Sequence, residues 1–355
     1  MKFLRYTFYL LLILVLVITF VLLWPKGDLK TQMADSHVPA VGYALIEEGE
    51  VVEWQVLGEL ESGVPAPQHT IFNVASVTKP VFAVTVLSLI DKGALGLDEP
   101  LYPYWVDPEV AGDPRHKLLT ARIILSHQTG FPNWRWNTPD GKLAFAFDPG
   151  AEYGYSGEGM EYLRKAIEKK LNASWPALAD SLIFSPLGMK DSRLVWDEEM
   201  EEAPFAKWHN GEGELYDTFK RTHAVASDDL LTTVEDYAKF AIYVMNGVGL
   251  SEELWKEMGT NQLATDGDRV SGLGWELILG LPQDEYGLVH GGSDMGVKSR
   301  VAILPKSKRA FIMFTNGDKG QRLIDRWMVK RFDPKGELIS RMYAPFFWRI
   351  IYLPF

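Results

Sequence analysis

The sequence contains no cysteine, and its seven histidines are scattered along the chain. Without thiols the protein can form neither a disulfide framework nor a thiolate metal site. No two histidines follow the His-x-x-x-His or His-Glu-x-x-His spacing that is typical of zinc hydrolases. We therefore expect a protein that works without a metal ion or another cofactor.

Positive charge is also scarce. Lysine and arginine number 36 against 47 acidic residues, and the net charge is -11. This balance leaves no basic face for nucleic acid, so we expect no nucleic-acid partner. With 355 residues, of which 47% are hydrophobic and 23% charged, the chain has the composition of a globular protein with a sizeable core.

An almost uninterrupted apolar run occupies residues 6–24, about the length that crosses a bilayer as a helix. Lys2 and Arg5 precede the run, and no small-x-small cleavage site follows it. We therefore predict a membrane anchor over residues 1–26, with the rest of the chain on the extracytoplasmic side, periplasmic or extracellular. A cleaved signal sequence is the alternative, and it too places the protein outside the cytoplasm.

The rest of the chain is predicted to comprise a polar linker at 27–40, a folded domain at 41–331 and an aromatic extension at 332–355. The extension ends in Phe, Trp, Ile, Tyr and Leu around Arg349, a composition that suits a membrane interface. Two interpretations remain open for this tail: it rests on the bilayer, or it packs back onto the domain.

Strand patterns lie near both ends of the predicted domain, and helical patterns lie between them. We expect strands at 41–46, 51–56, 287–290, 297–304 and 309–315, and helices at 77–92, 158–170, 234–245 and 320–331. This order does not fit alternating βαβ units. It predicts an α+β fold, in which an antiparallel sheet built from both chain ends is flanked by helices and carries an inserted helical lobe.

A serine, a lysine and a proline stand together at the head of one predicted helix, in the stretch NVASVTKPVF. Proline is tolerated only in the first helical turn, so Pro80 fixes the start of the helix near Ser76. Lys79 follows Ser76 by about one turn on the same face. Amides at a helix start stabilise an oxyanion, and a proton-sharing lysine can activate a serine. The pattern indicates a serine nucleophile; a plain helix cap is the alternative.

Two further stretches follow in order along the chain. DPGAEYGYSGEGMEYL carries Tyr155-Ser156-Gly157 before a predicted helix, and LVHGGSDMGVKSRVAIL carries His290-Gly291-Gly292 at the end of a predicted strand. Together with FNVASVTKPVFAV and LLTARIILSHQTGFPNW, they resemble the serine β-lactamase-related family. This family includes class C β-lactamases, penicillin-binding DD-peptidases, D-aminopeptidases and carboxylesterases. The resemblance spans about residues 41–328 and implies a β-lactamase-like fold and acyl-enzyme chemistry.

The resemblance also implies catalytic roles. Ser76 would be the acylated nucleophile and Lys79 its proton partner. Tyr155 would be the general base in acylation and would return the proton to the leaving group. His290 stands where β-lactamases have the lysine of their Lys-Thr-Gly motif, so it would orient Tyr155 and meet the substrate.

The same resemblance implies how the substrate is held. The backbone amides of Ser76 and Ser293 would form the oxyanion hole. The expected substrate-binding residues are Gly157, Gly291, Gly292 and Trp134. We expect Trp134 and Trp136 at the rim of the cleft, and Trp208 and Trp275 in the core. His127 is expected to bond a backbone group, and Glu158 to be a first-turn carboxylate favoured by the helix dipole.

Two departures from the family pattern bear on the substrate. Gly157 replaces an asparagine that would hold an acyl-amide carbonyl, and His290 replaces a charged lysine by a ring that is mostly neutral near pH 7. Both weaken the case for β-lactams and for peptides that end in a free carboxylate, and esterases and aminopeptidase-like members resemble this form more closely. The leading expectation is a membrane-anchored serine hydrolase that acts on a small-molecule or peptide ester or amide. A DD-carboxypeptidase or β-lactamase is the first alternative. A catalytically idle, ligand-binding relative is the second.

Overall fold

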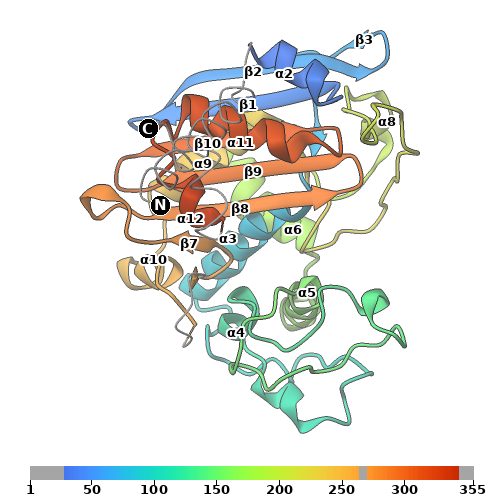
Figure 1. Ribbon diagram of the computed structural model, residues 1–355. Helices are drawn as coiled ribbons and strands as arrows, with labels where there is room; N and C mark the ends of the chain where they lie inside the picture. Colours follow the sequence, from blue (N-terminus) through green and yellow to red (C-terminus); the bar gives the residue numbers. More distant parts are fainter. Residues whose placement is uncertain (1–27, 264–269, 344–355) are drawn as a thin grey trace, which may run out of the picture.

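A computed structural model describes residues 28–263 and 270–343 of the chain (Figure 1). The predicted anchor at 1–26 and the last twelve residues of the predicted aromatic extension lie outside this range. Among the helices of the described residues, none combines the length and the apolar character needed to cross a membrane.

An antiparallel sheet of eight strands forms the centre of the protein, in the order β3-β2-β1-β10-β9-β8-β7-β6. Strands from the beginning of the chain lie beside strands from its end, and Val41 of β1 pairs with Thr315 of β10. The strands are β1 (Ala40–Glu47), β2 (Glu50–Glu61), β3 (Val64–Pro65), β6 (Val270–Ser271), β7 (Glu276–Ile278), β8 (Gly287–Asp294), β9 (Val297–Leu304) and β10 (Arg309–Thr315). The predicted α+β fold with a sheet built from both ends is confirmed.

Helices cover both faces of the sheet. Ala44 and Ile46 point to a core shared with α3 (Thr78–Asp91) and α9 (Val234–Met245). Tyr43 and Leu45, which alternate with them along β1, point to a second core beneath α2 (Leu29–Asp35) and α11 (Gly320–Arg331). Because both faces are covered, the central strands are apolar almost without interruption, and this explains the continuous hydrophobic runs in the sequence.

A lobe containing α4 (Ala121–Leu125) and α5 (Gly157–Leu171) lies beside the sheet (Figure 1). α3 lies between this lobe and the sheet, and its residues from Thr78 to Leu89 are all buried. A helix that is apolar on every side is stable only when it is enclosed in this way. The enclosure fixes the start of α3, and with it the position of Ser76. The remaining helices are α6 (Trp175–Ala179), α7 (Ser185–Leu187), α8 (Glu198–Glu202), α10 (Glu252–Met258) and α12 (Ile339–Met342).

The ends of the domain differ from the sequence prediction. Residues 27–40 were predicted to be a linker, but the described part of this range contains α2, whose Leu29 and Met33 are buried in the core beneath α11. At the other end, Leu338 and Ile339 of the predicted extension are buried as well. Each segment carries only a few apolar residues, so its sequence does not indicate a buried element. These residues become part of the core because the folded sheet offers an apolar face for them to cover.

Candidate active site

Ser76 lies in a single 3-10 turn, η1 (Ala75–Val77), directly before α3. Its neighbour Ala75 has φ 47, a left-handed conformation that is costly for a residue with a Cβ. Asn73 supports this conformation, because its Oδ1 accepts a hydrogen bond of 2.7 Å from the Ala75 amide. The turn therefore holds Ser76 in a defined orientation at the start of a buried helix.

Lys79 is the polar partner of Ser76. Its Nζ lies 2.9 Å from Ser76 Oγ and 2.7 Å from the carbonyl oxygen of Ser227, and its side chain is buried. Among the described residues, no carboxylate is within salt-bridge distance of this amine. The lysine is therefore held between a carbonyl and a hydroxyl and has no ion-pair partner there, an environment suited to proton exchange with the serine.

Tyr155 and His127 form the next layer. Lys79 Nζ is 4.7 Å from the centre of the Tyr155 ring, and the rings of Tyr155 and His127 are 4.4 Å apart. His127 Nδ1 accepts a hydrogen bond of 3.1 Å from the Ser156 amide, so the expectation of a backbone partner is confirmed. Burial holds the pKa of His127 well below its usual range. The neutral ring supports Tyr155 and leaves its remaining proton on Nε2.

His290 approaches the same point from β8. Its ring centre is 6.3 Å from that of Tyr155, and its Nδ1 donates to the Gly291 carbonyl over 2.9 Å. Burial, and to a lesser extent the positive charge of Lys79, lower the pKa of His290 to about 3. The ring is therefore neutral at physiological pH, and its Nε2 can accept a hydrogen bond but not donate one.

Gly292 brings β8 against the nucleophile turn. A Cβ at this position would be 2.3 Å from the Val74 carbonyl oxygen, so no other residue fits. Ser299 of β9 donates to the same carbonyl over 2.7 Å. Ser293 thus directly follows Gly292, the residue that contacts the turn carrying Ser76. An oxyanion hole formed by the backbone amides of Ser76 and Ser293 stays a prediction.

Gly157 is covered by Trp134. A Cβ at position 157 would be 3.0 Å from Trp134 Cη2 and 3.0 Å from the Asn133 carbonyl oxygen. Trp134 in turn stacks on Trp136, with ring centres 4.6 Å apart, and 65% of Trp136 is exposed. The pair therefore forms a partly exposed aromatic surface over Gly157, the first residue of α5. Trp208 and Trp275 are buried in the core, as expected.

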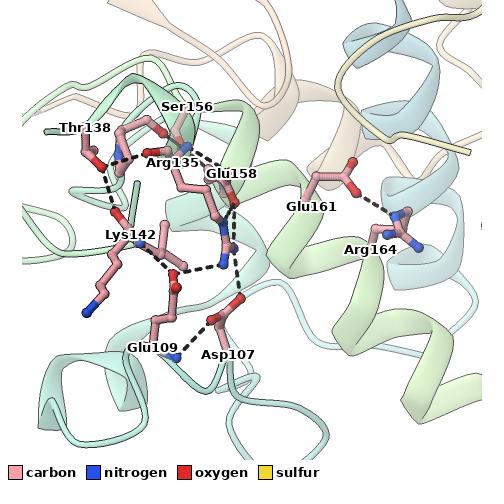
Figure 2. A network of polar contacts seen from close by, with 12 residues as sticks. Asp107, Glu109, Arg135, Thr138, Lys142, Ser156, Glu158, Glu161 and Arg164 are labelled. Atoms are coloured by element: carbon pink, nitrogen blue, oxygen red, sulfur yellow. Dashed lines mark hydrogen bonds and ion pairs between the residues drawn. The ribbon is translucent and has the colours of Figure 1, made fainter. Parts of the chain in front are cut away.

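The loop that carries the two tryptophans is held by an ion-pair network (Figure 2). Arg135 contacts Glu158 over 2.8 Å, Asp107 over 2.9 Å and Glu109 over 3.0 Å. Glu158 also accepts from the Arg135 amide, and it is buried. The expected first-turn carboxylate of α5 therefore has a second task, because it fixes the loop that bears Trp134.

The sequence did not identify the Ser227–Asp229 segment. The Ser227 carbonyl holds Lys79, and the next residue, Asp228, has its pKa raised to about 7 by burial and by the charge of Asp229. Carboxylate oxygens of Asp228, Asp229 and Asp294 lie within 4.8 Å of one another. Asp229 is already paired with Arg221 and bonded by Asn73, so this group offers a metal ion fewer free ligands than it requires.

A family model described as Beta-lactamase matches residues 27–332. Among curated proteins, esterase EstB of Burkholderia gladioli is 31% identical over 188 residues, 45% of this chain and 47% of the esterase. The chain thus spans about half the length of that relative. Penicillin-binding protein 4 of Amycolatopsis lactamdurans is 26% identical over 317 residues, 80% of this chain and 82% of its own.

A solved structure shares the fold. The octameric penicillin-binding protein homologue from Pyrococcus abyssi superposes with a TM-score of 0.71 at 22% identity, over 88% of this chain and 78% of the other. This likeness concerns the arrangement of sheet and helices. The octameric assembly is a property of the Pyrococcus abyssi protein.

Proposed function

The chain belongs to the beta-lactamase family, and from this premise we propose that it is a serine hydrolase that cleaves an ester or amide through an acyl-enzyme on Ser76. The observation that carries the proposal is the contact of 2.9 Å between Lys79 Nζ and Ser76 Oγ, made by a buried lysine. A plain helix cap would need neither the lysine nor its second bond to the Ser227 carbonyl.

The proposed reaction has two halves. Ser76 Oγ attacks the acyl carbonyl while its proton passes to the pair formed by Lys79 and Tyr155, and Tyr155 returns that proton to the departing alcohol or amine. Water then attacks the acyl-enzyme, its proton follows the same route, and Ser76 is released. His290 Nε2 accepts a hydrogen bond from Tyr155 or from the substrate, and the Ser76 and Ser293 amides stabilise the oxyanion.

Two features favour an ester or a simple amide over a β-lactam or a peptide that ends in a free carboxylate. His290 is neutral, so it brings no charge to the position that faces the substrate. Trp134 occupies the space over Gly157 where an amide side chain would lie, and it offers an apolar surface instead. A DD-carboxypeptidase or β-lactamase acting on cell-wall peptides or β-lactams remains the alternative.

We further propose that residues 1–26 anchor the hydrolase domain in a membrane and that the cleft faces the extracytoplasmic side. The support is the apolar run at 6–24 with Lys2 and Arg5 before it. Fractionation of cells that express the protein with and without residues 1–26 tests this location. Equal distribution of the two forms between membrane and soluble fractions would contradict it.

The assignment of Ser76 is tested by labelling the full-length protein with a fluorophosphonate and mapping the modified peptide. We expect modification at Ser76 and none in the Ser76→Ala variant. A fluorescent penicillin provides the second arm. Labelling by penicillin alone would favour the cell-wall alternative, and labelling by neither reagent would favour an idle, ligand-binding relative.

A further inference from the structure

Ala75, the residue before Ser76, is held in its left-handed conformation by hydrogen bonds on both sides. Its φ is 47, and the residue is fully buried. The Ala75 amide donates to Asn73 Oδ1 over 2.7 Å, and the Ala75 carbonyl oxygen accepts from Thr78 Oγ1 over 2.6 Å. The conformation that orients Ser76 therefore depends on the side chains of Asn73 and Thr78.

A distant segment of the chain holds those two side chains in turn. Asn73 Nδ2 donates to Asp229 Oδ1 over 2.9 Å, and Thr78 Oγ1 accepts from the Leu230 amide over 2.9 Å. The Leu230 carbonyl oxygen also accepts from the Val74 amide over 3.0 Å. Two consecutive residues, Asp229 and Leu230, thus form a brace that supports both hydrogen bonds of the turn carrying the nucleophile.

Asp229 is the unusual member of this brace. Its φ is 67, a left-handed conformation that glycine adopts at lower cost than aspartate. The residue is only 6% exposed, and Arg221 forms an ion pair with its Oδ2, which leaves Oδ1 to accept from Asn73. A buried carboxylate and a left-handed backbone are both costly, and such costs are typical of positions with a specific task.

We propose that Asp229 is a positioning residue for the nucleophile, and that it acts on Ser76 through Asn73 and the Ala75 amide. The carboxylate accepts from Asn73 Nδ2 and thereby fixes the orientation in which Asn73 Oδ1 faces Ala75. In the opposite orientation the Asn73 side chain would present a donor to the Ala75 amide, and the left-handed turn would lose its support. The inference rests on the proposed hydrolase function and adds a residue that acts indirectly.

The test exchanges the two polar groups of this contact. Asp229→Asn puts an amide between Asn73 and Arg221, so one of these two neighbours meets a donor instead of an acceptor. Asn73→Asp sets two carboxylates against each other. In the combined variant, the aspartate placed at position 73 accepts from the Ala75 amide and from the asparagine placed at position 229, whose oxygen accepts from Arg221. Every contact is then restored with the charge moved by one residue.

The measured quantities are kcat and KM of the four full-length proteins for p-nitrophenyl butyrate, a neutral ester. We expect each single variant to lower kcat by about tenfold to 10²-fold, the cost of a misplaced catalytic group, while KM changes little. The combined variant should have a kcat at least about fivefold above that of either single variant, because the effects of contacting residues are not additive. Losses that simply multiply in the combined variant, or full activity in Asp229→Asn, would overturn the proposal.

Two further variants separate positioning from folding. Asp229→Gly removes the carboxylate but suits a φ of 67, so the protein should fold and its kcat should still fall. Asp113→Asn is the matched control, because it makes the same chemical change in an aspartate that is paired with an arginine, Arg115, and it should leave kcat unaltered. An unaltered kcat in folded Asp229→Gly would refute the role of the carboxylate.

Hydrogen–deuterium exchange of the peptide that contains Ala75 judges the brace without turnover. We expect the amides of this peptide to exchange faster in either single variant than in the unaltered protein, and the combined variant to regain the protection. Equal exchange in all four proteins refutes the brace. If the unaltered protein hydrolyses the ester no faster than Ser76→Ala but exchange follows the expected pattern, the hydrolase proposal fails and the brace stands.

Discussion

Trp134 lies directly over Gly157, so close that a Cβ at position 157 would be 3.0 Å from Trp134 Cη2. The glycine amide is also held from below, because it donates to the backbone carbonyl and to the side-chain oxygen of Asn133, each over 3.0 Å. The indole of Trp134 therefore fills the space that a side chain at position 157 would need. Any side chain at 157 has to displace the indole.

This pairing predicts coupling between the two positions. Gly157→Asn should destabilise the protein by about 1–3 kcal/mol, because extra atoms are forced into a filled space. In a Trp134→Ala background the same substitution should cost less, because the indole is gone. Urea unfolding of the four proteins gives the coupling free energy. Strictly additive effects would mean that Trp134 does not limit the size of residue 157.

Replacing the lysine beside Ser76 tests the proposed proton transfer. Lys79→Met keeps the length of a buried side chain but removes the amine that contacts Ser76 Oγ and the Ser227 carbonyl. We expect kcat for p-nitrophenyl butyrate to fall by about 10²- to 10⁴-fold, the usual contribution of a positioned proton-transfer group. Lys207→Met, which alters a partly exposed lysine paired with Glu61, is the control. Unchanged turnover in Lys79→Met would exclude Lys79 from the reaction.

The ion-pair network of Figure 2 predicts a stability effect with an optical signature. Glu158→Gln leaves Arg135 with a weaker partner at the base of the tryptophan loop, and we expect a loss of about 2 kcal/mol or more in the free energy of unfolding. Acrylamide should then quench the fluorescence of the loop tryptophans more efficiently. Glu152→Gln is the control, because Glu152 is exposed and precedes Tyr155 in the sequence; it should change neither the free energy of unfolding nor the quenching. Unaltered quenching in Glu158→Gln would show that the loop is held by other contacts.

The lowered pKa of His290 predicts how acid affects stability. In the folded protein this pKa is about 3, against 6.5 in an unfolded chain. Between these two values the unfolded chain binds a proton that the folded protein does not, so this group makes stability fall as the pH falls from about 6.5 toward 3. His290→Gln removes the effect. The free energy of unfolding should therefore become less acid-sensitive, by up to about 1.4 kcal/mol per pH unit.

Urea titrations at several pH values between 7 and 4 provide the measurement. Parallel curves for the two proteins would mean that His290 is protonated as readily in the folded state as in the unfolded one. The comparison is made within one pair of proteins, so other groups that titrate in this range, such as Asp228, contribute equally to both curves.

Elements with complete local signals could be predicted from the sequence. The observed bounds of β9, β10, α9 and α11 coincide with the predicted ones, because turns and caps mark their ends. Thr233 is an example: its Oγ1 accepts from the Asp236 amide over 3.1 Å and starts α9 as expected. Short segments such as α2 carry too few apolar residues to indicate a helix by themselves.

The sequence alone also indicated the contact between Ser76 and Lys79, since residues three apart at the start of a helix lie on the same face. Only the tertiary structure decided what completes the site. The Ser227 carbonyl that holds Lys79 is 148 residues away from it along the chain, and it acts through its backbone, which has no residue-specific pattern. Arg300 lines a cavity beside Tyr155 and His290, because the register of β8 and β9 places it opposite Gly291. Such contacts depend on which distant segments of the chain are brought together and on the strand register, and both are fixed by the packing of the whole sheet.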